Sequence, residues 1–544
     1  MSTKFDVIII GSGPAGVSAA FPLLEAGLNV LMIDGGKVPD MAPPEQDFLS
    51  ARRDDFEQWK WMIGQDFRAI HMRSAVSPKF RVPSLAFTFD GFEQGNNIKG
   101  KNFVTIGSLA AGGLSNAWGC GVARFSSAEL AEFPSEASSD MERSYEVVSR
   151  RIGISGKIDD DMSDYFKLDT YAQPPIPMDP LHASLATRYA TQRTKLRAQG
   201  FRMGRSRVAA LSEDVGSRKA CNLSGNCLWG CRRRSLYSAA DDLPKLHRYE
   251  NFSRLAGFLV DGLTRRDGSW NIEGQGTDGT RRAIVAKTLL LAAGTLATTR
   301  LVLSALRYEE AVPVQSSPMA VFALWLPRFL ATQRVPGFGL GQLSFAVTLA
   351  KATAFGSTFS TTGLPVSEFA RHLPWRRRYG IDILSSLLGS CLAGNVFLPG
   401  NLTAGEARLQ KDGALMVSGA YRGPVMPLMK EAADKLRRAY RSLGAFLLPG
   451  SFTIGAPGGD IHYAGTLPMR NQPAIGESSP VGEVMGLEGV YVVDGACLPI
   501  LPEKSHTLTI MANADRIGRK IAVLQRRRAG YKPVASVPVM PTGS

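Results

Sequence analysis

Two histidines lie in glycine-containing segments towards the end of the sequence. His462 lies in GDIHYAGTLPM (459–469), and His506 lies 44 residues later in YVVDGACLPILPEKSHTLTIMANADRIG (491–518). The pKa of an imidazole lies near neutrality, so a histidine can accept the proton of a hydroxyl group. A carbon that carries a hydroxyl gives up hydride easily only while the alkoxide develops. Histidines in such segments are therefore candidates for the base of an alcohol oxidation.

A glycine-rich turn at the start of the sequence has the pattern that binds a dinucleotide. Gly11, Gly13 and Gly16 form GxGxxG within GSGPAG, after an apolar run and before an expected helix at 14–26. These glycines would allow the tight turn, the close approach of a pyrophosphate and close helix packing. Asp34 follows 23 residues after Gly11, at the end of the second expected strand, where a carboxylate accepts hydrogen bonds from ribose. The turn alone leaves FAD and NAD both open.

A third segment, GSLAAGGLSNAWGCG (107–121), is also rich in glycine and other small residues. Small residues are needed where the backbone must approach a cofactor closely. Together with the two histidine segments, this stretch resembles the glucose-methanol-choline (GMC) oxidoreductases, flavoenzymes that oxidise alcohols and sugars. The resemblance predicts FAD rather than NAD. One departure is Leu467-Pro468-Met469, where many relatives have Arg-Met-Gly.

The resemblance implies a role for each histidine. In that family a His opens an HxxGT segment, and a second His or Asn precedes a helix of the TLTIMA type. His462 would be the general base that takes the hydroxyl proton, and His506 would orient the same oxygen, while hydride passes to flavin N5. The helix that starts at Thr507 would direct its positive end at the flavin N1 and C2 carbonyl.

The resemblance also places residues around the cofactor. Asp494 and Gly495 would lie near the ribityl chain and pyrophosphate, and Asn116 would be the polar contact at the flavin edge. In the pyranose oxidase branch a histidine that carries the flavin covalently lies in a similar segment; Ala117 takes that place here, so we expect dissociable FAD. The full expected set of cofactor contacts is Gly11, Gly13, Pro14, Ala15, Gly16, Asp34, Gly112, Gly113, Ser115, Asn116, Ala117, Ala293, Gly294, Asp494, Gly495, His506 and Thr507.

Three of the six cysteines lie in CNLSGNCLWGC, as Cys221, Cys227 and Cys231. The spacing resembles the segment that holds a 3Fe-4S cluster in FAD-dependent sugar dehydrogenases of the same family, where the cluster carries electrons from the flavin towards a haem or quinone partner. Reduced structural thiols and a disulfide are the alternatives. Zinc is disfavoured because no fourth ligand has finger-like spacing.

The composition is that of an ordinary globular protein, with 44% apolar and 20% charged residues, and the net charge is +15. Such a charge suits nucleic acid, an anionic membrane surface or an acidic substrate, but no nucleic-acid motif accompanies it. We expect no nucleic-acid partner. The first strand begins too early for a signal peptide, which predicts a cytoplasmic protein, with peripheral membrane contact and a lipid-linked substrate as further options.

The elements expected along the chain alternate between two kinds of domain. We predict a Rossmann-like α/β FAD-binding domain, interleaved with an α+β substrate domain built on an antiparallel sheet. The FAD-binding domain would comprise residues 1–140, 205–301 and 480–530. The substrate-binding domain would comprise 141–204 and 302–479, and residues 531–544 would form a flexible tail.

The function predicted is FAD-dependent oxidation of an alcohol or sugar hydroxyl to a carbonyl, with oxygen, a quinone or a redox protein as electron acceptor. An NAD(P)H-dependent flavoprotein reductase or monooxygenase is the alternative. It needs a second dinucleotide turn, for which GFGLG at 337–341 is the mid-chain candidate. A non-catalytic flavin-binding protein is a third interpretation.

Overall fold

The computed structural model describes residues 5–528 except 45, 66–76, 364–375, 377–378, 380–382 and 385–386. The expected tail at 531–544 therefore lies outside the described residues. The α-helices are α1 (Pro14–Glu25), α2 (Phe48–Asp54), α3 (Gln58–Ile63), α5 (Ala86–Phe89), α6 (Phe92–Gly95), α7 (Ser127–Leu130), α8 (Ser135–Ser139), α9 (Met141–Ile152), α10 (Ser163–Phe166), α11 (Pro180–Ala198), α12 (Leu243–Leu246), α13 (Thr295–Leu306), α16 (Val425–Ser442) and α17 (Thr507–Arg528).

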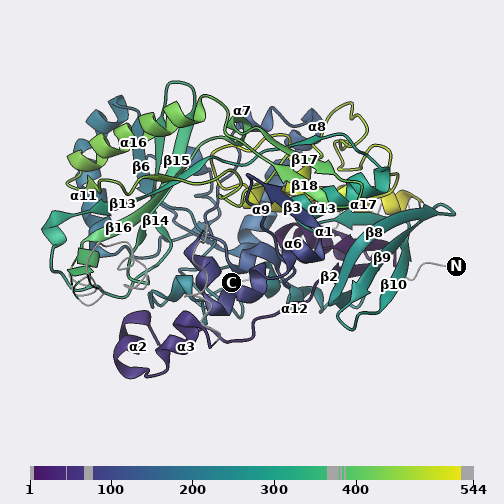
Figure 1. The fold of residues 1–544 in the computed structure, drawn as a ribbon, viewed down its shortest axis with the longest axis horizontal. Coiled ribbons are helices and arrows are strands. Elements are labelled where there is room, and N and C mark those ends of the chain that lie inside the picture. Colours follow the sequence, from purple (N-terminus) through teal and green to yellow (C-terminus); the bar gives the residue numbers. More distant parts are fainter. Residues whose placement is uncertain are drawn as a thin grey trace.

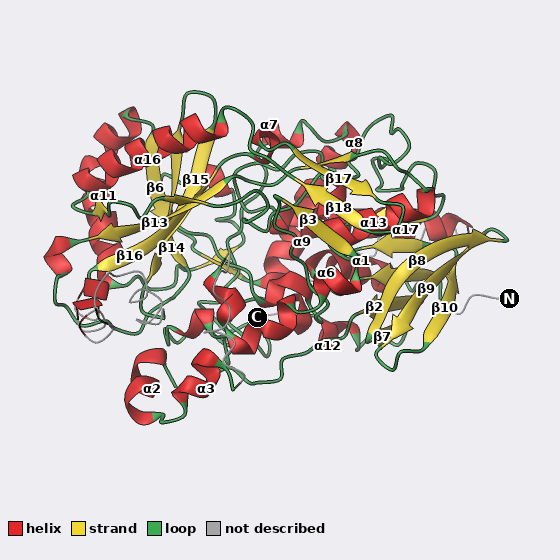
Figure 2. Cartoon of the chain, viewed as in Figure 1, coloured by secondary structure: helices red, strands yellow, loops and turns green. Residues whose placement is uncertain are grey.

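The strands form separate sheets (Figures 1 and 2). They are β1 (Val7–Ile10), β2 (Val30–Asp34), β3 (Ile98–Lys101), β4 (Ile154–Ser155), β5 (Ala172–Gln173), β6 (Phe201–Arg205), β7 (Phe252–Ala256), β8 (Phe258–Arg266), β9 (Ser269–Gly276), β10 (Arg281–Ala286), β11 (Leu289–Leu291), β12 (Val312–Val314), β13 (Met319–Trp325), β14 (Gly341–Thr348), β15 (Thr353–Ser360), β16 (Cys391–Phe397), β17 (Gly405–Leu409), β18 (Leu415–Ser418), β19 (Phe446–Leu447), β20 (Thr453–Ile454) and β21 (Val490–Val492).

A parallel sheet holds the N-terminal turn, in the order β21-β11-β1-β2-β7. The strand β1 has four consecutive buried apolar residues, which is typical of a parallel strand covered on both faces. Its register pairs Ile9 with Leu290 of β11 on one side and with Met32 of β2 on the other. The carboxyl ends of β1, β2 and β11 consequently meet at one edge, where nucleotides bind in open α/β sheets.

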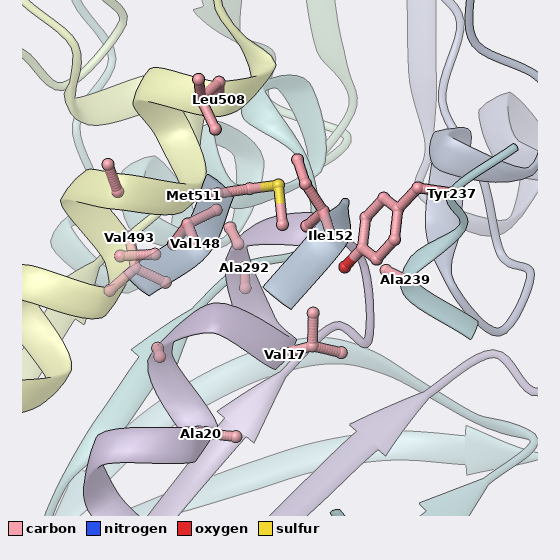
Figure 3. Close-up of a cluster of buried hydrophobic side chains, with 14 of the residues drawn as sticks. Val17, Ala20, Val148, Ile152, Tyr237, Ala239, Ala292, Val493, Leu508 and Met511 are labelled. Atoms are coloured by element: carbon pink, nitrogen blue, oxygen red, sulfur yellow. The ribbon is translucent and has the colours of Figure 1, made fainter. Parts of the chain in front are cut away.

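Three helices pack together over one face of this sheet. Val17 and Ala20 of α1, Ile152 of α9 and Met511 of α17 are fully buried in one apolar cluster, shown in Figure 3. Small residues on α1 allow the helices to approach closely. The first and the last helices of the described chain are thereby packed side by side, so the C-terminal segment belongs to the same body as the N-terminal turn.

An antiparallel sheet forms the other region, in the order β19-β13-β16-β15-β14-β6, with β20 paired to β13. Helices α11 and α16 cover one face (left side of Figure 1). Burial alternates along β16, so Leu392 and Val396 face those helices while Asn395 and Phe397 face the opposite way. The sheet therefore turns every second side chain towards the interior of the molecule.

The two regions are joined by a shared sheet as well as by the chain. Strand β3, from the first expected FAD-binding segment, pairs in parallel with β18, from the second expected substrate-binding segment. The predicted combination of a Rossmann-like domain with an antiparallel-sheet domain is confirmed. Among the described helices, none combines the length and apolar character needed to cross a membrane.

Candidate active site

A cavity of about 1370 Å³ lies between the parallel sheet and the antiparallel sheet. One end is lined by the turn at Gly11–Ala15 and by Asp34, and the other end by the inward face of β13 to β16. His462 and His506 line the cavity between these two ends. A cofactor bound along the first wall would thus meet a substrate bound against the second.

The glycine turn is packed so tightly that side chains are excluded from two of its three glycines. A Cβ on Gly11 would lie 2.1 Å from the carbonyl oxygen of Ala292, and Gly11 has a φ of +110°. A Cβ on Gly16 would lie 1.9 Å from the carbonyl oxygen of Gly11. A Cβ on Gly13 would meet only the Cα of Gly113, at 3.9 Å, and Gly13 lines the cavity. Gly13 therefore leaves room for a ligand rather than for the protein itself.

Most of the predicted cofactor residues do line the cavity. They are Gly11, Gly13, Pro14, Ala15, Asp34, Gly113, Ser115, Ala117, Ala293, Gly294, Asp494, Gly495, His506 and Thr507. The chain brings them from six separate stretches of sequence. A space lined by backbone and small residues in this way fits the pyrophosphate and the flat ring of a flavin dinucleotide.

Three predicted residues do not line the cavity: Gly16, Gly112 and Asn116. The contact of Asn116 with the cofactor edge stays a prediction, and in the structure its side-chain amide is hydrogen-bonded within the protein. Its Nδ2 donates to the carbonyl oxygens of Ala111 and Gly113, both at 2.9 Å, and its Oδ1 accepts from the Ser238 hydroxyl at 2.7 Å. Asn116 therefore shapes the loop that carries Gly113.

Asp34 lines the adenosine end of the cavity but is held by an arginine that sequence reasoning missed. Arg254, on the neighbouring strand β7, donates from Nε to Oδ2 at 2.8 Å and from Nη2 to Oδ1 at 2.9 Å. The Gly36 amide donates to Oδ1 as well, at 2.8 Å. The parallel register that pairs Met32 with Arg254 places this guanidinium beside the carboxylate. No motif marks Arg254, because its position depends on strand pairing.

The Asp494 carboxylate is also held in place by hydrogen-bond donors of the protein itself. Its Oδ2 accepts from the Gly294 amide at 2.9 Å and from the Thr298 hydroxyl, and its Oδ1 accepts from the Ala496 amide at 3.0 Å. Burial raises the pKa of Asp494 to about 6. Asp494 thereby joins the end of β21 to the start of α13, and Gly294 and Gly495 lie at the cavity surface beside it.

The two histidines face each other across the middle of the cavity. Their ring centroids are 4.8 Å apart and their ring planes are inclined by 76°. His506 immediately precedes α17, and its carbonyl oxygen accepts the first helical hydrogen bond, from Ile510. Phe397 of β16 lies 5.4 Å from the His462 ring, so the antiparallel sheet reaches the same point. The predicted pair is brought together.

A third group, Asp460, lies behind His462 and was missed from sequence. Its Oδ2 is 3.6 Å from His462 Nδ1 and accepts a hydrogen bond from the Ser317 amide at 2.7 Å. Asp460 Oδ1 and His462 Nδ1 are buried without a hydrogen-bond partner among the described residues. A carboxyl two residues before a candidate base was the signal that could have found it.

The backbone between Asp460 and His462 adopts an unusual conformation that brings the two side chains together. Ile461 has a φ of +62°, in the left-handed region that β-branched residues avoid. The Tyr463 hydroxyl donates to the carbonyl oxygens of Val104 and Gly458, at 2.8 and 3.0 Å, and so holds this turn from outside. Such strain persists where surrounding contacts impose it, and it is concentrated at functional sites.

Burial sets the protonation of all three groups. Burial lowers the pKa of His462 to about 4, and burial together with the neighbouring His462 lowers the pKa of His506 well below its usual value. Burial raises the pKa of Asp460 well above its usual range. Both imidazoles are therefore neutral at pH 7, so one can accept a proton while the other donates a hydrogen bond.

The predicted iron-sulfur ligand set is not supported. No group of three His, Cys, Asp or Glu side chains in the described part of the chain is arranged to hold a metal ion. Cys221, Cys227 and Cys231 are free cysteines. Two of the sulfurs accept hydrogen bonds from backbone amides: Cys221 Sγ from Leu223 and Cys227 Sγ from Gly339. Burial raises the pKa of both these thiols, which disfavours the thiolates that a cluster needs.

The candidate second dinucleotide turn at 337–341 has a different structure. Phe338 and Leu340 are buried in the core, and the segment leads directly into β14. A dinucleotide turn requires a helix after the glycines, so GFGLG does not form one. The alternative of an NAD(P)H-dependent reductase depended on this turn and is therefore no longer supported by it.

Comparison with known families agrees with the two ends of this site. A model of the pyridine nucleotide-disulphide oxidoreductase family matches residues 5–106, and a model of the GMC oxidoreductase family matches residues 453–514. The first range contains the glycine turn. The second contains Asp460, His462 and His506.

Individual proteins are similar over the whole length or over the N-terminal part. The chain is 25% identical to the paromamine 6'-oxidase of Streptomyces fradiae, over 95% of this chain and 91% of that protein. It is 31% identical over 90 residues to the FixC protein of Azotobacter vinelandii, covering 14% of this chain and 21% of that protein.

A solved structure shares the fold. It is the pyridoxine 4-oxidase from "Mesorbium loti", with a TM-score of 0.60 and 15% sequence identity, and the match covers 95% of this chain and 99% of that one. The fold, the matched family regions and the full-length relative agree with one another. The chain belongs to the GMC oxidoreductases, FAD-dependent enzymes that oxidise the hydroxyl group of an alcohol or a sugar.

Proposed function

We propose that this enzyme oxidises a free small-molecule alcohol, with His462 as the base that removes the hydroxyl proton. The main support for this proposal is the position of the two neutral imidazoles, whose ring centroids are 4.8 Å apart. They line one cavity between a wall formed by backbone and a wall formed by side chains. A substrate carbon placed there would be in contact with both histidines and with the cofactor space.

The cofactor would be held by non-covalent contacts. Gly13 leaves open space beside the turn, and Asp34 and Asp494 are pre-oriented at separate points of the same wall. When FAD is bound there, its isoalloxazine ring accepts the two electrons that leave the substrate carbon. Ala117 lines the cavity without a nucleophilic atom, so this position forms no covalent link.

Proton transfer would depend on His462 and Asp460 together. With its Nδ1–H directed at Asp460, His462 presents Nε2 to the substrate hydroxyl. When His462 takes the proton, the Asp460 carboxylate stabilises the resulting imidazolium, as a buried carboxylate does in a catalytic triad. The 3.6 Å separation is longer than a hydrogen bond, and catalytic contacts of this kind shorten when substrate is bound. Asp460 is thus a positioning residue for the base.

His506 would hold the hydroxyl oxygen rather than compete for its proton. Its lowered pKa keeps the ring neutral, so its remaining N–H can donate to the developing alkoxide. The position of His506 directly before α17 adds the unpaired amides of the first helical turn, and Thr507 lines the same cavity. The alkoxide would therefore form where positive potential is concentrated.

The test is the His462→Ala variant under anaerobic conditions. We expect full FAD content and a fall of about 10²- to 10⁴-fold in the rate at which an alcohol bleaches the flavin, as for loss of a general base. His247, an exposed histidine on the surface, provides the matched control, and His247→Ala should bleach at the wild-type rate. Bleaching unaffected in His462→Ala would refute the assigned base. Reoxidation by oxygen, a quinone or a redox protein, measured in the same cell, identifies the acceptor.

A further inference from the structure

The sheet wall of the cavity is arranged in bands. Nearest to His462, cross-strand neighbours Met319, Phe397 and Phe355 form an apolar row. Two residues further along each strand, Val321, Asn395, Ser357 and Ser344 form a second row. Two residues along a strand correspond to about 7 Å. A polar row therefore lies about 7 Å beyond the aromatic side chain that touches the candidate base.

The side chains of the polar row are hydrogen-bonded to one another and to the backbone, except for the Nδ2 donor of Asn395. Ser206 Oγ and Ser344 Oγ are 2.7 Å apart, and Ser344 Oγ and Ser357 Oγ are 2.8 Å apart. Asn395 Oδ1 accepts from the Ser357 amide at 3.0 Å. Asn395 Nδ2 has no hydrogen-bond partner within the described part of the chain, and Asn395 lines the cavity. The row thus offers a fixed N–H donor to whatever lies against the sheet.

Negative charge is absent from this wall among the described lining residues. The carboxyl groups that line the cavity are Asp34, Asp460 and Asp494. Asp34 is paired with Arg254, Asp494 is bonded at the end of β21, and Asp460 lies behind His462, 3.6 Å from its Nδ1, so none of the three belongs to the polar row. Each ammonium group of a cationic substrate such as an amino sugar needs a carboxylate partner, so this wall suits an uncharged molecule better than a cationic one.

We propose that the polar row is a second substrate-binding site, which takes an acceptor oxygen of an uncharged alcohol whose aromatic or apolar body lies on Phe355 and Phe397. The inference rests on the proposed function and narrows its substrate class. Asn395 Nδ2 donates to the acceptor oxygen, while the oxidised carbon lies at His462. A neutral substrate of this kind differs from paromamine, after which the full-length relative is named.

Two isosteric probes separate the hydrogen bond from packing. In para-methoxybenzyl alcohol an ether oxygen occupies the place that a methylene occupies in para-ethylbenzyl alcohol. We expect the wild type to favour the methoxy compound, and Asn395→Leu to lower the ratio of the two kcat/KM values about fivefold, the usual value of one hydrogen bond. Dividing the variant's ratio by that of the wild type cancels the electronic difference between the two compounds.

Asn395→Asp is the second variant, and it preserves the hydrogen bond that residue 395 accepts from the Ser357 amide. Its carboxylate still accepts from the Ser357 amide, while the Nδ2 donor is replaced by an oxygen. The methoxy preference should disappear, and para-(aminomethyl)benzyl alcohol should improve relative to both neutral probes because a carboxylate now faces its ammonium group. Asn471→Leu, at an exposed asparagine of the surface, is the matched control and should leave every ratio unchanged.

Binding measured without turnover separates this inference from the proposed function. In a His462→Ala background, each probe is titrated against the absorbance of the oxidised flavin to give its Kd. If the methoxy probe has a lower Kd than the ethyl probe, and Asn395→Leu removes this difference, the polar row binds substrate. This conclusion would hold even if no alcohol is oxidised. A preference that survives both Asn395 variants overturns the inference, as does a wild type that binds the aminomethyl compound more tightly than the neutral pair.

Discussion

The two walls of the cavity recognise their ligands in different ways. The parallel-sheet wall presents backbone, at glycines where a side chain would collide with the protein or with the ligand. The antiparallel-sheet wall presents side chains, one from every second residue of four strands. Backbone recognition fixes residue types over a short stretch of sequence. Side-chain recognition distributes the specificity over strands far apart in sequence, where single substitutions can change it.

The largest effects are expected from substitutions on the backbone wall, and they should be of two kinds. In Gly11→Ala the new Cβ would lie 2.1 Å from the Ala292 carbonyl oxygen, at a φ that only glycine adopts readily, so we expect loss of soluble, folded protein. In Gly13→Ala the Cβ would enter the cavity instead. That variant should fold normally but bind FAD at least tenfold more weakly.

Circular dichroism and flavin fluorescence distinguish these two outcomes. If Gly13→Ala binds FAD as the wild type does, the backbone wall does not contact the cofactor at this turn. If Gly11→Ala folds and binds FAD, the tight packing against Ala292 is not required. Either result would weaken the contrast between the two walls.

A smaller effect is expected from Asp460→Asn, which tests the Asp460–His462 pair between the two walls. The amide can still accept from His462 Nδ1, but the charge is lost, so kcat should fall about 10- to 100-fold. Burial raises the pKa of Asp460 and lowers that of His462 to about 4. The wild-type kcat/KM should fall as pH drops through the raised pKa of Asp460, whereas in the variant the acid limb should move down towards pH 4.

The other titratable groups around Asp460 and His462 must be excluded as the source of the acid limb. The titratable groups that face Asp460 and His462 are His506, Tyr421 and Tyr463. The pKa values of both tyrosines are raised and that of His506 is lowered, so none of the three is expected to produce an acid limb near neutral pH. An acid limb that is unchanged in Asp460→Asn would exclude Asp460 from proton transfer.

Stability should change in the opposite direction to activity in the same variant. A carboxyl whose folded pKa is raised contributes stability below its unfolded pKa of about 3.8, and this stability is lost as pH rises through the folded value. Asp460→Asn does not ionise, so its melting temperature relative to the wild type should increase with pH. A melting-temperature difference that is constant with pH would mean that burial does not raise the pKa of Asp460.

The smallest effect is expected at Arg254, which holds the Asp34 carboxylate at the adenosine end of the cavity. Arg254→Met should weaken FAD binding about tenfold, because Asp34 loses two charge-assisted hydrogen bonds that orient it. Arg281 makes two similar bonds to Asp261 on the exposed surface, which makes Arg281→Met the matched control. Calorimetric titration of the apoenzyme with FAD gives both values, and equal values would remove Arg254 from the cofactor site.

The difference between the walls also explains what could be predicted from the sequence. The turn at Gly11 and the segments around His462 and His506 are contiguous, so their spacing identified the fold and the family. Arg254 reaches Asp34, and Asn395 reaches the cavity, only through strand register, which no local pattern specifies. The hydrogen bond that Asn116 Oδ1 accepts from Ser238 could not be predicted either, because Ser238 lies 122 residues away in sequence. The cysteine segment had the spacing of a ligand set without the arrangement of one.

The packing of α17 against α1 has a consequence for how the enzyme is made. Strand β21 completes one edge of the parallel sheet, and α17 covers it, yet both come from the last 60 residues of the chain. Contacts of such high sequence separation slow folding. The dinucleotide site therefore matures only after β21 and α17 have been synthesised, and cofactor loading follows their synthesis. A protein shortened from its C-terminal end before β21 should accumulate as an aggregation-prone intermediate that never acquires the yellow colour of the flavin.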